Sequence, residues 1–465
     1  MASKKESKKY SHLQLKKQSV WEQTSPAEHK KIFSFNEDYK TFLKHAKTER
    51  LTVSYLVAQL KKNGFTLFSN QKSKTGDKLF LVFKEKVVFA WIVGKQKEQM
   101  VLIGSHSDSP RLDLKPLPLV EDSSMALFKT HYYGGIKKYH WVNTPLSLHG
   151  VVYTKAGKEI TISLGEKDNE PVFIIPDLLP HLARQQYEKK VSNFIEGEQM
   201  MVVVGGIPIK DDDLQEKIKI AILEKLNKQY GVVEEDFVSA ELSFVPQAQP
   251  KDVGFDASII GAYGHDDGVC VYTSLQALLD CEKPNSTAVA LFIDKEEIGS
   301  DGDTGAQSYV LRYFAEKYLT SINSKLSVDM FLSQANSLSA DVTSGLNPNY
   351  KDAQDPTNVS LLGHGVSLEK YGGGGGKYST NDASAKYMSF IRQILLTEKI
   401  MWQTGENGRV DLGGGGTIAK YFSRYGMSCV DIGPCVLGMH SPYELVSKAD
   451  VYEAYRCYKA FFTKA

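Results

Sequence analysis

Short apolar runs alternate along most of the chain with segments that are apolar on one side only. The uninterrupted run from Ala288 to Ile293 is typical of a parallel strand buried on both faces, and helical spacing in 53–63 predicts an amphipathic helix. Similar patterns predict strands at 79–84, 87–93, 100–104 and 428–433 and helices beginning at 265 and covering about 304–320, 382–398 and 449–463. This alternation predicts an α/β fold whose mixed sheet carries helices on both faces.

The pattern changes between about residues 112 and 252, where the apolar runs are shorter. Strands are expected there at 147–154, 159–164 and 200–205, with an acidic amphipathic stretch at 211–230. A chain of 465 residues also exceeds what one hydrophobic core usually serves. We therefore expect a discontinuous catalytic domain of residues 1–112 and 252–465, interrupted by a β-rich oligomerisation domain of residues 113–251. Residues 1–36 are polar and rich in lysine, which predicts a loosely ordered arm.

Composition is that of an ordinary soluble globular protein, with 42% hydrophobic and 24% charged residues. The net charge of +1 gives no general attraction to nucleic acid or to a membrane surface. No apolar stretch approaches the roughly 18 residues of a membrane span, and the lysine-rich first ten residues do not resemble a signal peptide. Five cysteines without a C-x-x-C pair argue against a disulfide framework and against a thiolate zinc site. A cytoplasmic protein is the expectation.

Ionisable side chains follow several of the predicted strands, and Glu296 and Glu297 are the most informative. Adjacent carboxylates repel each other, so a cation or a shared proton would have to hold them together. Taken alone, such a pair is typical of a solvated acidic turn. The full set of strand-end residues is His106, Asp108, Asp266, Asp267, Glu296, Glu297, Asp341 and His440. Mixed imidazole and carboxylate ligands suit zinc, cobalt or manganese, and the set contains the parts of a two-metal hydrolase.

Other kinds of site are disfavoured by specific residues. The glycine run at 372–376 followed by Lys377 suggests a phosphate-binding loop, but Tyr378 stands where Ser or Thr would bind magnesium. There is no G-x-S-x-G elbow for a serine hydrolase and no signature of a catalytic cysteine. Singly, each metal candidate has a simpler interpretation: His440 as a structural histidine and Asp341 as a helix or turn cap.

Five motifs together resemble the aspartyl aminopeptidases, and in particular their bacterial branch. They are His-Ser-Asp-Ser-Pro at 106–110, Asp-Asp at 266–267, Asp-Lys-Glu-Glu-Ile-Gly-Ser at 294–300, Ser-Ala-Asp at 339–341 and Gly-Met-His-Ser at 438–441. The resemblance extends from about residue 50 to the end of the chain. It implies a zinc exopeptidase with two ions per subunit, or cobalt or manganese in their place, that releases N-terminal residues from peptide substrates.

The resemblance also implies a role for each motif residue. His106 and Asp341 would bind one ion and Glu297 and His440 the other. Asp266 would bridge both ions and form a cis peptide with Asp267. Glu296 would be the general base, and Asp108 would accept a hydrogen bond from His106.

In this family the inserted domain forms dimers that build a shell of twelve subunits, and its histidine reaches a neighbour's active site. The matching residue is His181, which would bind the developing oxyanion. A single zinc ion bound by His106, His181 and His440 is a competing interpretation, but it leaves the acidic motif residues without a role. A surface histidine is the simplest interpretation of His181.

Substrate preference follows from the resemblance less directly. Lys370 matches the family lysine that contacts an acidic side chain, but the glycines at 372–376 depart from the family pattern. Preference for N-terminal Asp or Glu is therefore a hypothesis. Two other functions stay open: cleavage of other amide bonds, and an inactive, peptidase-derived scaffold or peptide-binding shell protein. The scaffold would be expected if a ligand or Glu296 were missing, and none is.

Overall fold

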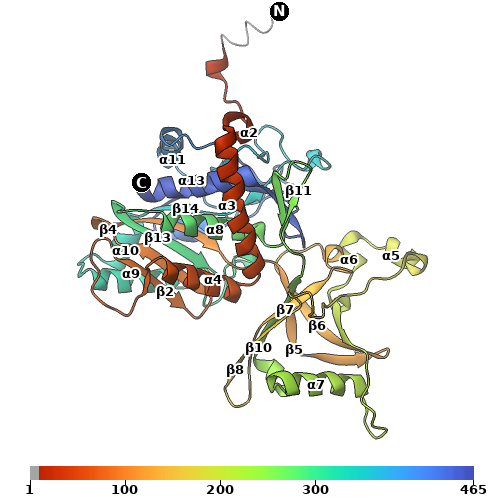
Figure 1. Cartoon of the computed structure of the whole chain (residues 1–465). Helices are drawn as coiled ribbons and strands as arrows, with labels where there is room; N and C mark the ends of the chain where they lie inside the picture. Colours follow the sequence, from red (N-terminus) through yellow and green to blue (C-terminus); the bar gives the residue numbers. More distant parts are fainter. Residues whose placement is uncertain (1–9) are drawn as a thin grey trace, which may run out of the picture.

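The computed structural model describes residues 10–465, so residues 1–9 of the predicted arm lie outside the described residues (Figure 1). A nine-stranded sheet with its helices forms one side of the molecule, and a six-stranded sheet forms the other (Figure 1). Among the helices of the described region, none is both long enough and apolar enough to cross a membrane.

The nine-stranded sheet is mixed, as the sequence predicts. Its strands follow in the order β1 (Thr66–Leu67), β2 (Lys78–Phe83), β3 (Val87–Ile92), β13 (Ser286–Ile293), β4 (Gln96–His106), β14 (Asn336–Ser339), β18 (Ser428–Gly433), β16 (Val366–Glu369) and β17 (Trp402–Thr404). Strands β13, β4, β14 and β18 run parallel, whereas β3 pairs antiparallel with β13. The run at 288–293 is therefore parallel to one neighbour only. The carboxyl ends of the four parallel strands meet at one edge of the sheet.

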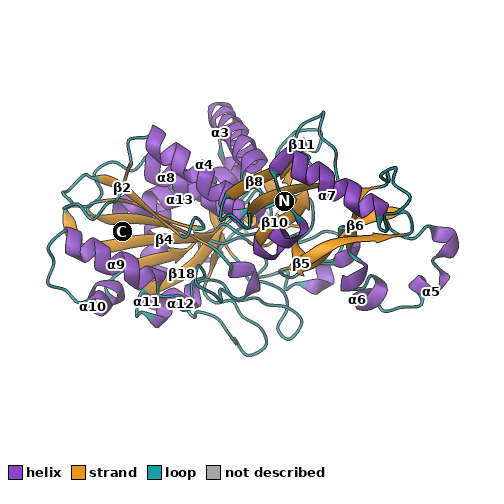
Figure 2. Cartoon of the chain, turned by 90° about the horizontal axis from the view of Figure 1, so that it is seen from below, coloured by secondary structure: helices purple, strands orange, loops and turns teal. Residues whose placement is uncertain are grey.

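Helices cover both faces of this sheet, which confirms the predicted fold class (Figure 2). One face packs against α3 (Pro26–His45), α4 (Glu49–Lys62), α8 (His265–Leu279), α11 (Ala385–Thr397) and α13 (Lys448–Lys464), and the other against α9 (Val310–Ser321), α10 (Val328–Ser333) and α12 (Ala419–Arg424). Along β13, Ala288, Ala290 and Phe292 join the first core, while Val289 and Leu291 join the second. Burial on both faces explains why this run is uninterrupted.

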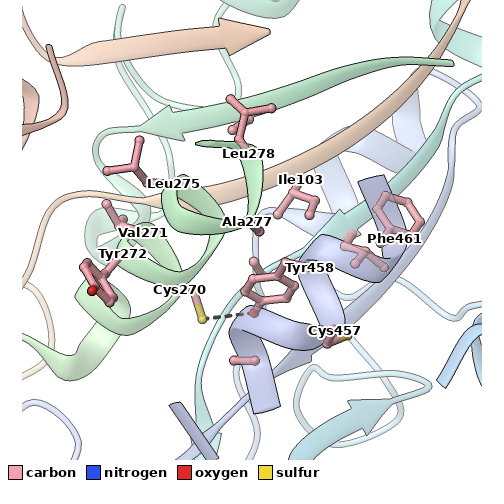
Figure 3. Close-up of a cluster of buried hydrophobic side chains, with 14 of the residues drawn as sticks. Ile103, Cys270, Val271, Tyr272, Leu275, Ala277, Leu278, Cys457, Tyr458 and Phe461 are labelled. Carbon is pink, nitrogen blue, oxygen red and sulfur yellow. Dashed lines mark hydrogen bonds between the residues drawn. The ribbon is translucent and has the colours of Figure 1, made fainter. Parts of the chain in front are cut away.

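Helices α8 and α13 are packed together below the sheet's central strand (Figure 3). The hydroxyl of Tyr458 on α13 donates to the carbonyl of Ile432 at 2.8 Å and lies 3.4 Å from the sulfur of Cys270 on α8. Ile103 of β4 belongs to the same cluster. This packing fixes α8, whose first turn carries Asp266, against the strand that ends at His106.

Two helices lie in the second half of the predicted N-terminal arm. They are α2 (Val20–Gln23) and α3, so the prediction of a loose arm was wrong from residue 20 onward. Ser25 and Glu28 form a capping box that begins α3, and Ile32, Tyr39 and Phe42 are buried. These buried residues are spaced over several turns among many charged ones. The apolar stripe is therefore too sparse to be recognised in the sequence.

The second sheet is antiparallel, and all six of its strands lie between Arg111 and Pro246. Its order is β8 (Glu159–Leu164), β7 (Leu146–Tyr153), β10 (Ala240–Pro246), β5 (Arg111–Asp122), β6 (Met125–Tyr133) and β9 (Met201–Gly205), with α7 (Lys217–Tyr230) packed on it and the short α5 (Arg184–Tyr187) and α6 (Val191–Phe194) nearby. The sequence predicted β7, β8 and β9 but missed the other three strands. In β5 this has a clear cause, because Pro116 and Pro118 interrupt the pattern where the register shifts.

A small third sheet connects segments that are distant in sequence. Its order is β11 (Lys251–Val253), β12 (Ile259–Ala262), β20 (Glu444–Ser447), β19 (Cys435–Leu437) and β15 (Thr343–Ser344). Strand β12 directly precedes α8, and β19 and β20 enclose the loop that contains His440. The sheet therefore brings the Asp266 and His440 loops together.

Candidate metal centre

The predicted ligands meet at the carboxyl edge of the nine-stranded sheet. His106 is the last residue of β4, Asp266 lies in the first turn of α8, and Glu297 follows β13 in the 3-10 turn Glu296–Ile298. Asp341 follows β14, and His440 lies between β19 and β20. A cleft of about 430 Å³ opens above them and is lined by Asp266, Glu296, Glu297, Asp341 and His440 among others.

Asp266 stands at the centre of the group. Its Oδ1 lies 3.2 Å from Nε2 of His106, and its Oδ2 lies 3.2 Å from Nε2 of His440. Asp341 adds Oδ1 at 3.8 Å from His106, and Glu297 adds Oε2 at 3.2 Å from His440. Two three-residue groups with ligand atoms within 4.8 Å of one another result, and they share Asp266. The peptide bond from Asp266 to Asp267 is cis, as the resemblance implies.

These distances fit divalent ions. Zinc bonds of about 2.0–2.2 Å in tetrahedral geometry place two ligand atoms of one ion about 3.4 Å apart. Nδ1 of His106 lies 3.0 Å from the carbonyl of Asp108, and Nδ1 of His440 lies 2.7 Å from the carbonyl of Gly135. Because a carbonyl can only accept, both histidines carry the hydrogen on Nδ1 and offer the Nε2 lone pair to a metal. Within the described chain, the buried Oε1 of Glu297 has no hydrogen-bond partner.

The electrostatics of the cleft also favour cations. Burial raises the pKa of Glu296 to about 8, an effect that His106 opposes and Asp341 reinforces. Burial lowers the pKa of His440, but Asp266 and Glu297 outweigh this effect and raise it to about 10. Four carboxylates therefore share a buried space with two histidines. Divalent ions would compensate this negative charge.

Asp108 connects the two sides of the centre. Its Oδ1 accepts from the backbone N–H of Glu296 and its Oδ2 from that of Glu297, both at 3.1 Å. The same carboxylate lies 3.4 Å from Nδ1 of His106. Burial raises the pKa of Asp108, but His106, Tyr133 and Arg111 outweigh it and keep the pKa below its ordinary value. Asp267 is fully buried and accepts from the backbone N–H of His106 at 3.2 Å.

Two of the predicted site residues are not brought to this cleft. His181 lies in the 3-10 turn Pro180–Leu182, is exposed, and is absent from the cleft lining. Figure 1 places α5, which follows it, at the far end of the second sheet. Lys370 also lies outside the lining, and its ammonium is 3.3 Å from the carboxylate of Asp382. Their roles stay predictions.

Several residues of the site were not singled out in the sequence. Glu444 accepts from the backbone N–H groups of Asp266 at 3.1 Å and of His440 at 2.7 Å. Gly135 supplies the carbonyl for His440, and Lys420 is a cation of the cleft lining. Glu444, four residues after His440, could have been noticed from its spacing. The glycine run 413–416 contributes backbone to the cleft lining. It also contacts the glycine run 372–376, because the backbone N–H of Gly373 donates to the carbonyl of Gly415.

Comparison with known proteins gives consistent results over nearly the whole chain. The family model for aminopeptidase I zinc metalloproteases (M18) matches residues 42–462. The probable M18 family aminopeptidase 1 of Borreliella afzelii is 46% identical over 457 residues, which span 96% of this chain and 100% of that protein. The crystal structure of an M18 family aminopeptidase from Thermotoga maritima superposes with a TM-score of 0.93 at 43% identity, covering 97% and 100% of the two chains.

A more distant structure shares the fold. The S. cerevisiae mApe1, solved as a dodecamer, has a TM-score of 0.74 at 20% identity and covers 92% of this chain and 95% of its own.

Proposed function

This chain belongs to the M18 family of aminopeptidase I zinc metalloproteases, and from that premise we propose that its cleft holds two metal ions. As a member of the family, the protein is a metal-dependent aminopeptidase. The observation that carries the proposal is the position of Asp266, whose two oxygens lie 3.2 Å from the Nε2 atoms of two different histidines. A carboxylate shared in this way could bind both ions of a two-metal hydrolase, one through each oxygen.

Each remaining motif residue has a proposed role at this centre. His106 and Asp341 would hold one ion, and Glu297 and His440 the other, which leaves Glu296 free. Two ions held by these residues would lower the pKa of a bound water and polarise the scissile carbonyl. Oε2 of Glu296 lies 3.9 Å from Nε2 of His106, and Glu296 belongs to neither ligand group. From there its carboxylate can take a proton from the attacking water and return it to the leaving amine.

Zinc is the metal of the family, and the donor set supports it. Imidazole and carboxylate ligands also accept cobalt or manganese, so the ion that supports turnover has to be measured. The proposal of two ions predicts that saturated protein contains two equivalents. A single zinc bound by three histidines would contain one, and would lose it when His181 is replaced.

We further propose that the enzyme prefers acidic N-terminal residues. An acidic side chain in a cleft already rich in carboxylates needs a cation of its own. Lys420 of α12 lines the cleft, with its ammonium held 2.9 Å from Oγ of Ser379. Lys370, the lysine implied by the resemblance, pairs instead with Asp382 outside the lining. Lys420 is thus the better supported of the two candidates.

Residues 113–251 are proposed as the oligomerisation domain. Their strands form a separate sheet with its own core. Around His181 several large apolar side chains are exposed, namely Leu178, Leu179, Leu182, Tyr187 and Val191. A patch of this kind is typical of a protein interface, and another copy of this chain is the proposed partner. The distant yeast relative is a dodecamer, which is compatible with a closed assembly here. We propose that in such an assembly His181 reaches a neighbouring cleft.

A panel of aminoacyl chromogenic substrates tests the enzymatic proposal. Purified protein is assayed with zinc, cobalt or manganese, with and without a chelator, and its metal content is measured in parallel. We expect release of free N-terminal residues that chelation abolishes and added metal restores. N-acetylated versions of the same substrates are the matched control, because an aminopeptidase requires a free amine. Failure to cleave any substrate with any metal would favour the inactive scaffold.

A further inference from the structure

A short segment of the proposed oligomerisation domain reaches into the metal centre. It consists of Tyr133, the last residue of β6, and the two glycines that follow. The carbonyl of Gly135 accepts a hydrogen bond from Nδ1 of His440 at 2.7 Å. The hydroxyl of Tyr133 donates to Oδ2 of Asp108 at 2.8 Å. One segment therefore contacts a proposed ligand of one ion directly and, through Asp108, the histidine of the other.

The Tyr133 ring has little freedom to move. The Arg111 guanidinium lies 3.9 Å from the ring centre, and Arg111 is itself held by Asp113 at 2.8 Å and by Glu49 at 3.3 Å. Tyr133 and Arg111 are both at least nine-tenths buried. A phenol fixed in this way holds one carboxylate oxygen of Asp108 in a defined direction. That carboxylate in turn holds the backbone of the proposed base and of the ligand next to it.

Gly134 fits the segment closely against the centre. Its φ of +76° lies in the region that glycine adopts without strain. A Cβ atom at this position would stand 3.3 Å from Cβ of Glu297, which is tighter than ordinary contact, and 3.4 Å from the ring of Pro110. A residue other than glycine would be strained at this φ and would require the segment or Glu297 to shift by a few tenths of an ångström.

We propose that residues 133–135 are a positioning segment through which the inserted domain orients both metal-binding histidines. This inference rests on the two-metal function proposed above and adds residues to it. Groups that fix the hydrogen-bonded face of a metal-binding histidine set both its tautomer and the direction of its lone pair. Here the groups that do so come from the part of the chain otherwise proposed for assembly. The inserted domain would then have a role in metal retention within a single chain.

Two variants with matched controls test the proposal in the full-length protein. Tyr133→Phe removes only the hydroxyl that binds Asp108, and Tyr132→Phe removes a hydroxyl from the neighbouring, exposed ring. Gly134→Ala displaces the segment. Its control is Gly157→Ala, which carries a similar φ of +74° but meets nothing within 4 Å.

The readouts are the rate of zinc release to a chelator and the visible spectrum of the cobalt-substituted protein. We expect Tyr133→Phe and Gly134→Ala to release zinc about 10–100-fold faster than wild type and to change the cobalt spectrum, while both controls match wild type. Metal-free Tyr133→Phe should have the same melting temperature as metal-free wild type. A change in metal release would then reflect the orientation of the ligands and not a loss of folding stability. Wild-type release rates and spectra in Tyr133→Phe would overturn the positioning role, whatever Gly134→Ala does. Failure of wild type itself to bind two ions would instead refute the function on which it rests.

Discussion

Glu444 accepts a hydrogen bond from the backbone N–H of Asp266 at 3.1 Å. Its other carboxylate oxygen accepts from the backbone N–H of His440 at 2.7 Å. One side chain thus fixes the backbone of the proposed bridging ligand and of a terminal ligand. Glu444 begins β20, which pairs with β12 directly before α8, so the small third sheet sets this geometry. Hydrogen bonds within the protein therefore fix the backbone of these two proposed ligands in the absence of a metal ion.

Glu444→Gln should weaken zinc binding about 10–100-fold. The amide offers one acceptor oxygen, and its nitrogen would face a backbone N–H that now has no acceptor. Competition titrations against a chelator of known affinity measure the loss. Glu224→Gln on the exposed side of α7 is the matched control, since its carboxylate pairs with Lys228 at the surface. Unchanged affinity in Glu444→Gln would show that the backbone of Asp266 and His440 needs no such support.

The adjacent glutamates should respond differently to the same substitution. Glu296→Gln should retain two zinc ions and lose about 10²–10⁴-fold in kcat, because it removes proton transfer but no ligand. Glu297→Gln should lose an ion, because Oε2 of Glu297 lies 3.2 Å from Nε2 of His440 within a ligand group. Metal content and kcat are measured on the same preparations. Full activity of Glu296→Gln would exclude it as the base.

Local sequence patterns predicted the catalytic sheet well. The strand at 428–433 was predicted with its observed bounds, and 288–293 forms the core of β13. These runs are buried on both faces, so their apolar character is continuous and easy to recognise. Helix α3 and strand β5 were missed because their buried positions are separated by charged residues or prolines.

The candidate site was predictable only as far as its side chains form local motifs. The resemblance was confirmed by the family match, and the proposed ligands are brought together. The carbonyl of Gly135 could not be predicted, because a backbone acceptor has no sequence signature. Lys420 could not be chosen over Lys370 either. Which lysine lines the cleft depends on the paths of the loops between β16 and β18, and these paths are set by tertiary contacts.

Zinc binding should release protons and strengthen as the pH rises. Burial lowers the pKa of His440, but Asp266 and Glu297 raise it to about 10, so at pH 7 the metal-free histidine carries a proton that zinc must displace. Burial raises the pKa of Glu296 to about 8, so its carboxyl group is also protonated at pH 7 in the metal-free protein. Loss of this proton at higher pH would likewise favour the binding of cations. Apparent affinity should therefore increase steadily from pH 6 toward pH 9. Calorimetry in two buffers of different ionisation enthalpy counts the protons, and affinity independent of pH would contradict the shifts.

Lys420→Met should reduce the preference for acidic over neutral N-terminal residues, and Lys370→Met should not. Loss of a charge-assisted hydrogen bond costs about 1.5–3 kcal/mol, which corresponds to a fall of roughly 10–150-fold in the aspartyl-to-leucyl ratio of kcat/KM. Methionine is unbranched and only one atom shorter than lysine, and it removes both the charge and the hydrogen-bond donors. The leucyl rate is the internal control, because it should stay near wild type when the centre is intact. If the ratio falls only in Lys370→Met, Lys370 and not Lys420 contacts the acidic side chain. If the wild-type enzyme cleaves aspartyl and leucyl substrates equally well, the proposed preference is refuted.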